Sequence, residues 1–214
     1  MTLAIGVTPG DGSGAVLLTD SLVQLRRGQG AVHALLHLTP RYERLPGAGG
    51  VAIVSCMADA GWAPCSTAVG IEAAGRELLV DLERNLAREA WQFADGRTVE
   101  ARGEIVAAGL DDAGNVQLVH GLTGGELHVA SGPTLVVGGA ARELPSARRF
   151  PAPPSDMTRC VRFALGVARA ILAEVAANGT LDEMLQRGEV PAMAPPIHLA
   201  VVTRDRVEFT RLQE

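Results

Sequence analysis

The order in which two hydrophobic periods follow one another along the chain is the feature that most constrains its fold. Apolar residues alternate with polar or turn residues in short runs over 3–55 and again over 104–137, as expected for β-strands. After each of these blocks the apolar residues recur every three to four positions, which is the period of an amphipathic helix. Two antiparallel sheets with helices on their outer faces would bury all of these stripes, so we predict an α+β fold.

The helical blocks are predicted at about 71–93 and 157–177. The second has Ser155 or Asp156 as a capping residue at its start. A broken helix is expected over 57–70, and the capping-box pattern that begins at Thr180 predicts one further short helix.

Strands are expected wherever a short apolar run lies between turn residues. The glycine-rich segment 10–14 joins two such runs, so it is interpreted as a hairpin turn, because a phosphate-binding loop would lead into a helix. Asp111 and Asp112 are interpreted as turn residues in the same way. The expected strands are, in chain order, 3–7, 15–18, 31–38, 51–55, 104–110, 116–120, 126–130, 134–137, 197–203 and 207–210.

Charge excludes several classes of function. The chain contains no lysine, since all 19 of its basic residues are arginine, and this excludes mechanisms that require a lysine amine, such as a pyridoxal Schiff base, a phosphate-loop lysine or a kinase-type lysine. A net charge of −5 with scattered arginines argues against a nucleic-acid partner. No apolar stretch approaches the roughly 18 residues of a membrane span, and the first residues do not have the pattern of a secretion signal. A cytoplasmic protein without a membrane partner is therefore expected.

The length of 214 residues fits a single domain over 1–214, because no linker divides the sequence. Three cysteines, Cys56, Cys65 and Cys160, are odd in number and form no C-x-x-C pair, so reduced core thiols are expected. No cofactor is implied. A metal contact between His33 and His37 is an open alternative, because these two side chains would share one face, but no third ligand follows at a recognisable spacing.

Thr2 is the sharpest candidate for chemistry. Methionine followed by threonine is a start from which the initiator residue is commonly removed, and removal would leave Thr2 with a free α-amine. That amine, with a pKa of about 8, can serve as general base for the threonine hydroxyl. The remaining histidines, His120, His128 and His198, are interpreted as partly buried, hydrogen-bonded side chains.

The order of these segments resembles that of proteasome β-type subunits and their bacterial relatives HslV and Anbu. No single segment carries the resemblance, which lies in the succession of motifs over nearly the whole chain. These motifs are Thr2–Val7, Gly14–Ser21, Tyr42–Gly47 (similar to the Anbu branch), Val51–Asp59, Ile105–Asp111, Val116–Leu118 and Val136–Ala140.

The resemblance implies the four-layer αββα sandwich of N-terminal-nucleophile hydrolases. It also implies that Thr2 is the nucleophile and Asp20 the carboxylate that orients the site. The family's lysine is replaced by Arg41 in one alignment and by His37 or Leu38 in another; an arginine would keep the charge, whereas a neutral histidine could relay a proton. By the same analogy, backbone amides of Gly138, Gly139 and Ala140 would stabilise the oxyanion.

The implied activity is a threonine peptidase or amide hydrolase that acts on peptide or amide substrates after removal of Met1 and assembles into a ring or other homo-oligomer. The sequence also departs from the family, since the lysine, the serine expected near Gly139 and the D-x-x-S-G motif expected near Asp182 are missing. A non-catalytic ring or scaffold subunit, or a ligand-binding shell, is therefore the alternative. A metal-dependent α+β enzyme built around His33 and His37 is a third interpretation.

Overall fold

The computed structural model describes ten stretches of the chain. They are residues 3–20, 22–27, 31–36, 42–55, 64–86, 91–92, 98–99, 103–130, 132–177 and 196–212.

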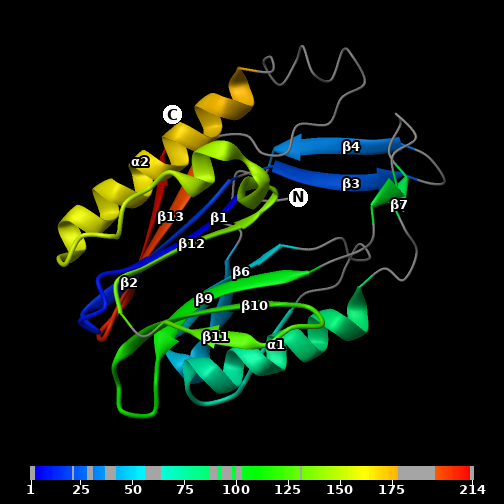
Figure 1. Ribbon diagram of the computed structural model, residues 1–214. Helices are drawn as coiled ribbons and strands as arrows, with labels where there is room; N and C mark the ends of the chain where they lie inside the picture. The colour runs from blue at the N-terminus through cyan, green and yellow to red at the C-terminus, as the bar shows by residue number, and fades with distance from the viewer. Residues whose placement is uncertain are drawn as a thin grey trace.

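Two five-stranded antiparallel sheets form the centre of the molecule (Figure 1). The first sheet has the order β12-β1-β2-β13-β14 and the second β11-β10-β9-β6-β5. The strands of the first sheet are β1 (Leu3–Thr8), β2 (Gly14–Thr19), β12 (Thr134–Gly139), β13 (Ile197–Thr203) and β14 (Val207–Leu212). Those of the second are β5 (Glu43–Leu45), β6 (Gly50–Ser55), β9 (Glu104–Leu110), β10 (Val116–Leu122) and β11 (Leu127–Val129).

Two small antiparallel pairs stand apart from these sheets in the described part of the chain. β3 (Leu22–Arg27) pairs with β4 (Ala31–Leu36), and β7 (Trp91–Gln92) pairs with β8 (Thr98–Val99).

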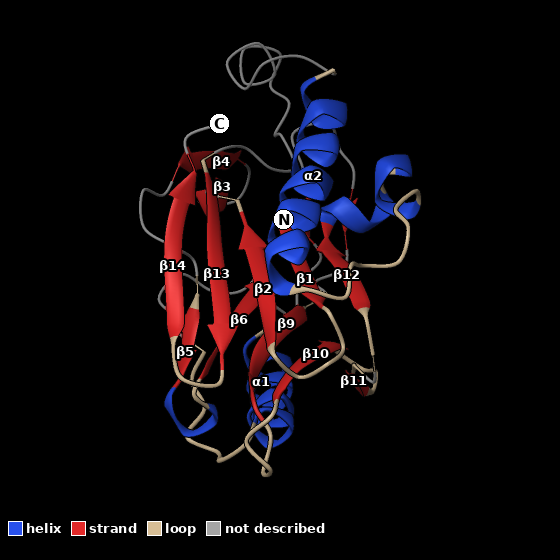
Figure 2. Cartoon of the chain, turned by 90° about the vertical axis from the view of Figure 1, so that its left-hand side faces the viewer, coloured by secondary structure: helices blue, strands red, loops and turns tan. Residues whose placement is uncertain are grey.

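A long helix covers the outer face of each large sheet. α2 (Met157–Ala176) packs on the first sheet and α1 (Ile71–Asn85) on the second, so the layers follow one another as helix, sheet, sheet, helix (Figures 1 and 2). Three 3-10 turns complete the described elements: η1 (Pro46–Ala48), η2 (Ala140–Glu143) and η3 (Pro145–Arg148). No described helix is long and apolar enough to cross a membrane.

Side-chain alternation along the strands explains why there are four layers. Leu3, Ile5 and Val7 of β1 point into the core beneath α2, whereas Ala4 points into the core between the two sheets. The inter-sheet core is narrow at Gly6, where an added Cβ would lie 2.8 Å from carbons of Leu118 and Val106. The strand block, helix, strand block, helix and hairpin of the sequence therefore fold as the predicted α+β sandwich.

The first helix is shorter than predicted. It ends at Asn85 instead of continuing to residue 93, and Trp91–Gln92 is a strand. The Asn85 side chain donates to the Asp81 carbonyl at 2.8 Å, and Leu86 is already extended, with φ −60° and ψ 132°. A local side-chain bond of this kind competes with helix continuation.

The broken helix predicted over 57–70 is also wrong for its described part, because residues 64–70 are not helical. Pro64 lacks an amide hydrogen, and Gly70 has a φ of +81° immediately before α1. The short helix predicted from Thr180 lies outside the described residues.

α2 agrees closely with the prediction. It begins after Asp156, whose Oδ1 accepts the Arg159 amide at 2.9 Å, as expected for an N-cap. The hairpin turn over 10–14 is confirmed, since Gly10 and Gly12 have positive φ angles of 83° and 72°. Sequence patterns did not predict strands β3 and β5.

Candidate functional site

Buried polar side chains gather at one end of the sandwich. Thr19 ends β2 and His198 lies near the start of β13, while Ser55 ends β6 and Glu104 begins β9. Among the described residues the buried polar side chains are Thr8, Thr19, Asp20, Ser55, Ser66, Glu104 and His198. The antiparallel pairing therefore brings Thr19, His198, Ser55 and Glu104 to the same end of their sheets, and Asp20 directly follows β2.

The strand register places several of these residues in one row. Gly138, Ala4, Thr19 and His198 are successive partners across β12, β1, β2 and β13. Ala4 belongs to the core between the sheets, and partners in register share a face, so Thr19 and His198 face the second sheet. A fully buried polar pair in this position interrupts an otherwise aliphatic inter-sheet core.

Asp20 holds the first described residue of β1. Its carboxylate is fully buried and accepts the Leu3 amide at 2.9 Å. Thr2 is joined directly to Leu3 in the chain, but Thr2, His37 and Arg41 lie outside the described residues. Of the predicted polar site residues, the structure thus describes Asp20 alone, and it describes this carboxylate next to the residue that follows Thr2.

Glu104 is the second buried carboxylate of this end. It accepts the Gly139 amide at 2.5 Å, the Nε2 of His120 at 2.6 Å and a guanidinium nitrogen of Arg142. The Glu104 side chain is 6% exposed, compared with 20% for His120 and 35% for Arg142. A carboxylate this deeply buried is tolerable because a guanidinium and two further N–H groups converge on it. These contacts tie β9 of the second sheet to β12 and η2 of the first.

Gly138 and Gly139, at the end of β12, both contact Glu104. A Cβ on Gly138 would lie 2.5 Å from Glu104 Oε1, so the close approach of the carboxylate requires glycine. Gly139 has φ 66° and ψ −150°, a conformation that disfavours side chains. Ala140 then starts η2, the turn that carries Arg142 to Glu104. The Gly139 amide, expected from the resemblance to face an oxyanion, donates here to a carboxylate.

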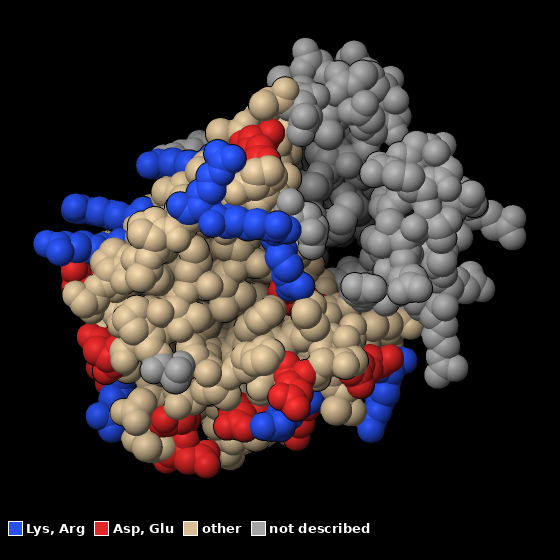
Figure 3. All heavy atoms as spheres, in the orientation of Figure 1, with Lys and Arg blue, Asp and Glu red and all other residues tan. Residues whose placement is uncertain are grey.

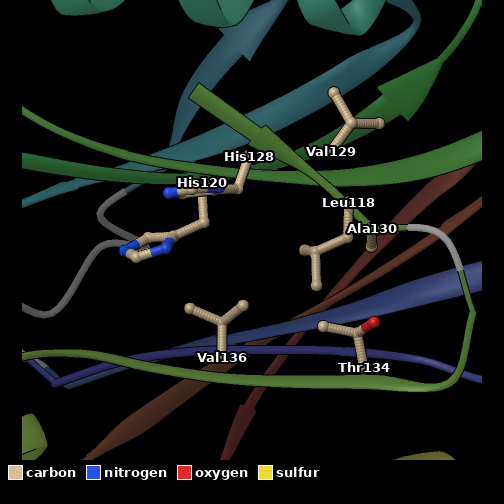
Figure 4. A pocket seen from close by; sticks show the side chains of 7 residues that line it. All are labelled: Leu118, His120, His128, Val129, Ala130, Thr134 and Val136. Atoms are coloured by element: carbon tan, nitrogen blue, oxygen red, sulfur yellow. The ribbon is translucent and has the colours of Figure 1, made fainter. Parts of the chain in front are cut away.

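A small pocket adjoins this cluster. It has a volume of about 200 Å³ and lies between β10–β11 and β12, with the two histidine rings on one side and aliphatic side chains around them (Figure 4). His120 and His128 are register partners, and their rings stack with centroids 6.4 Å apart. No group of three or more metal-ligating side chains is present among the described residues. The pocket is lined by Leu118, His120, His128, Val129, Ala130, Thr134 and Val136.

Tyr42 joins the sheets on the other side of the row. Its hydroxyl oxygen lies 2.9 Å from the Leu17 carbonyl oxygen and 2.6 Å from that of His198, so its single proton is shared between β2 and β13. Burial raises the pKa of Tyr42 well above its usual value of about 10. Its ring contacts Phe209 of β14 with centroids 5.5 Å apart.

Sequence patterns did not find the Glu104 cluster. The signal was present, because Glu104 opens an otherwise apolar strand, and an acidic residue in such a run needs partners when it is buried. Nothing in the local sequence identifies Arg142 or the distant His120 as those partners. His120 is hydrogen-bonded and partly buried, as predicted.

The remaining candidates are simpler. Asp111 is a turn residue as predicted, since its Oδ1 accepts the amides of Ala113 and Asn115 at 2.9 and 2.8 Å. Cys160 is a free, buried core thiol as predicted, whereas Cys65 is free but exposed, so the prediction of a core position is wrong for Cys65. Cys56 and His37 lie outside the described residues, and the His33 side chain is not described either.

Comparison with known proteins finds a similarity in structure but none in sequence. No known family model matches the sequence, and no curated protein matches it. Among solved structures, the αββα sandwich is similar to that of Anbu.

Three Anbu structures illustrate the similarity. Anbu (ancestral beta-subunit) from Yersinia bercovieri is 12% identical with a TM-score of 0.62, and the match covers 99% of this chain and 87% of that one. An Anbu (Gly-1) mutant from Hyphomicrobium sp. strain MC1 is 12% identical with a TM-score of 0.60 and covers 100% and 87%. Anbu from the same strain is 10% identical with a TM-score of 0.58 and covers 99% and 87%. At such identities the similarity defines the fold.

Proposed function

We propose that this chain is a proteasome-like amide hydrolase or peptidase whose nucleophile is Thr2 after removal of Met1. One observation carries the proposal: the fully buried Asp20 carboxylate accepts the amide of Leu3, the residue next to Thr2. Burial of a carboxylate costs free energy unless hydrogen bonds or opposite charges satisfy it, and buried carboxylates of this kind are often found at functional sites. The Anbu fold supports the same position for the site, at the start of β1.

In the proposed reaction the Thr2 hydroxyl attacks the substrate carbonyl, and the Thr2 α-amine takes the proton. Asp20 holds the start of β1 in register and favours a positive charge on the amine as the proton arrives. His37 or Arg41 would complete the site in place of the family's lysine. Backbone amides within 138–140 would stabilise the oxyanion, while the Gly139 amide stays bonded to Glu104.

The absence of lysine makes this mechanism unusually accessible to experiment. In the 214-residue chain the α-amine is the only amine, so an amine-selective reagent labels the proposed base alone. We expect the intact mass to show loss of Met1 and the labelling rate to rise with pH as the α-amine deprotonates.

Turnover of fluorogenic peptides is then compared among wild type, Thr2→Ala and Thr210→Ala. Thr210 is an exposed threonine of β14 and serves as the matched control. We expect Thr2→Ala to abolish turnover and Thr210→Ala to leave it unchanged. Full retention of Met1, or turnover that survives Thr2→Ala, would exclude the mechanism.

A second candidate function keeps the fold without the chemistry, as a ring or scaffold subunit. The observation in its favour is that the Gly139 amide is already paired with the anionic side chain of Glu104. A carboxylate at this position opposes the build-up of negative charge on a substrate oxygen. Complete removal of Met1 without turnover of any peptide in a broad panel would favour this candidate.

The resemblance also suggests where the protein is located and what it binds. We propose a cytoplasmic homo-oligomer that takes peptides or other amides, without nucleic acid, membrane, metal or cofactor.

A further inference from the structure

The buried carboxylates of Asp20 and Glu104 each accept the amide of one residue of the same β1–β12 pair. Leu3 and Gly139 are register partners at the end of the β1–β12 pairing. Leu3 donates its amide to Asp20 at 2.9 Å, and Gly139 donates its amide to Glu104 at 2.5 Å. The last rung of this ladder is therefore held on both sides by carboxylates, one from its own sheet and one from the opposite sheet.

Glu104 binds two side chains in addition to the Gly139 amide. The same carboxylate accepts Arg142 and His120, which come from η2 and β10. Gly138 leaves space for it that even a methyl group would fill. Since Glu104 sits in the second sheet and Gly139 in the first, its position sets how closely the sheets approach at the end where β1 begins.

We propose that Glu104 is a positioning residue for the N-terminal nucleophile. It holds the end of β12, and β12 in turn holds Leu3 in register, so the residue attached to Leu3 is placed relative to the wall formed by Gly138 and Gly139. The kinetic consequence rests on the proposed hydrolase function, whereas the structural consequence does not. Displacement of a reacting group by about 1 Å can cost roughly 100-fold in rate.

The kinetic experiment compares Glu104→Gln with Glu174→Gln. Glu174 is the matched control because its carboxylate also accepts a backbone amide, that of Ser146 at 2.9 Å, but it belongs to α2 and not to a sheet. We expect Glu104→Gln to lower kcat by about 100-fold with KM changed by less than about 3-fold, and Glu174→Gln to change neither. A folded, processed Glu104→Gln protein with wild-type kcat would overturn the proposal.

Arg142 supplies a second variant at a more accessible position, because its side chain is 35% exposed compared with 6% for Glu104. Arg142→Ala should change kcat in the same direction by a smaller factor, and Arg142→Lys, which keeps a positive charge near Glu104, should recover most of the loss. Equal activity of Arg142→Ala and wild type would count against the cluster as a positioning device.

Amide hydrogen exchange tests the proposal without any turnover. In Glu104→Gln we expect exchange to accelerate by about 10-fold or more in β1 and β12, with α1 and β14 unchanged. Unchanged exchange in β1, or acceleration spread evenly over the protein, would overturn the inference. If wild type shows no Thr2-dependent turnover, the proposed function fails while this exchange pattern still decides the role of Glu104.

Discussion

At the scale of single residues, Asp20 anchors the start of β1. It is fully buried, and the Leu3 amide that it accepts is at the first described position of the chain. Strand ends ordinarily fray because their amides can exchange partners with water. Here a buried side-chain acceptor holds the end of β1 instead, which suits a strand whose first residues are proposed to do chemistry.

Replacement of Asp20 by alanine is expected to cost both stability and activity. The variant leaves the buried Leu3 amide without its acceptor, so the free energy of unfolding should fall by about 1–3 kcal/mol. Turnover by Thr2 should be lost. Urea denaturation and peptide hydrolysis measure the two effects, with Asp11→Ala as control, because Asp11 accepts the Ser13 amide in an exposed turn. Equal stability of Asp20→Ala and wild type would show that the bond does not hold β1.

Tyr42 gives a pH dependence that can be measured directly, because it is the only tyrosine of the sequence. Its pKa is raised by burial, so above about pH 10 the unfolded chain loses the phenolic proton while the folded chain keeps it. The contribution of Tyr42 to stability should thus be fully present below pH 10 and decline above it. Phenolate absorbance of the native protein should appear at higher pH than that of the denatured protein.

Tyr42→Phe is the control for this effect. It should lower stability at neutral pH, since two carbonyls lose their shared donor, and it should lessen the decline above pH 10. Identical phenolate titrations of native and denatured wild type would contradict the assignment.

At the scale of elements, the contact between β12 and β9 is the critical one. Gly138 admits Glu104 only because it has no side chain. We expect Gly138→Ala to destabilise the protein by about 1–3 kcal/mol, as overpacking of a close contact does. Gly166, exposed in α2, has no atom within 4 Å of its missing Cβ, and Gly166→Ala should instead stabilise by about 0.5–1 kcal/mol.

Thermal denaturation of the two variants distinguishes these effects, which should differ in sign. If Gly138→Ala and Gly166→Ala both lower the melting temperature, the contact with Glu104 is not what distinguishes Gly138 from Gly166. Wild-type stability of Gly138→Ala would show that Glu104 can move away without cost.

The sequence predicted the elements better than it predicted their contacts. Strand and helix periods are local, so α2 and both halves of the sandwich followed from alternation and caps. The end of α1 did not, because it depends on one Asn85 side chain that turns back on Asp81. The Glu104 cluster joins β9, β10, β12 and η2, and such a meeting of distant residues has no local signal. Asp20 was found through a resemblance and not through its own neighbours.

At the scale of the whole molecule, charge is divided between the two helical layers. Arginine side chains gather in the upper part of Figure 3, on the side of α2, and acidic side chains gather in the lower part, around α1. Within α1, Glu72, Glu77, Asp81 and Glu83 outnumber Arg76 and Arg84. Opposite charge on different faces favours association between copies and makes it sensitive to salt.

We therefore expect the protein to form an oligomer that weakens as the salt concentration rises. Light scattering coupled to size-exclusion chromatography, at low and at high salt, measures both features. A monomer at low salt would contradict the assembly that the resemblance implies. A salt-independent oligomer would indicate that apolar contacts, and not these charged faces, hold the copies together.

The burial of Leu3 decides how this protein should be handled. An affinity tag fused ahead of it would crowd a position that is 0% exposed and would keep the α-amine from ever becoming free. The opposite end offers a better attachment point, because β14 is an edge strand whose central residues face solvent. A purification handle after β14 would therefore leave the start of β1 in its natural form, and a preparation tagged only at the front would be silent in every assay of Thr2.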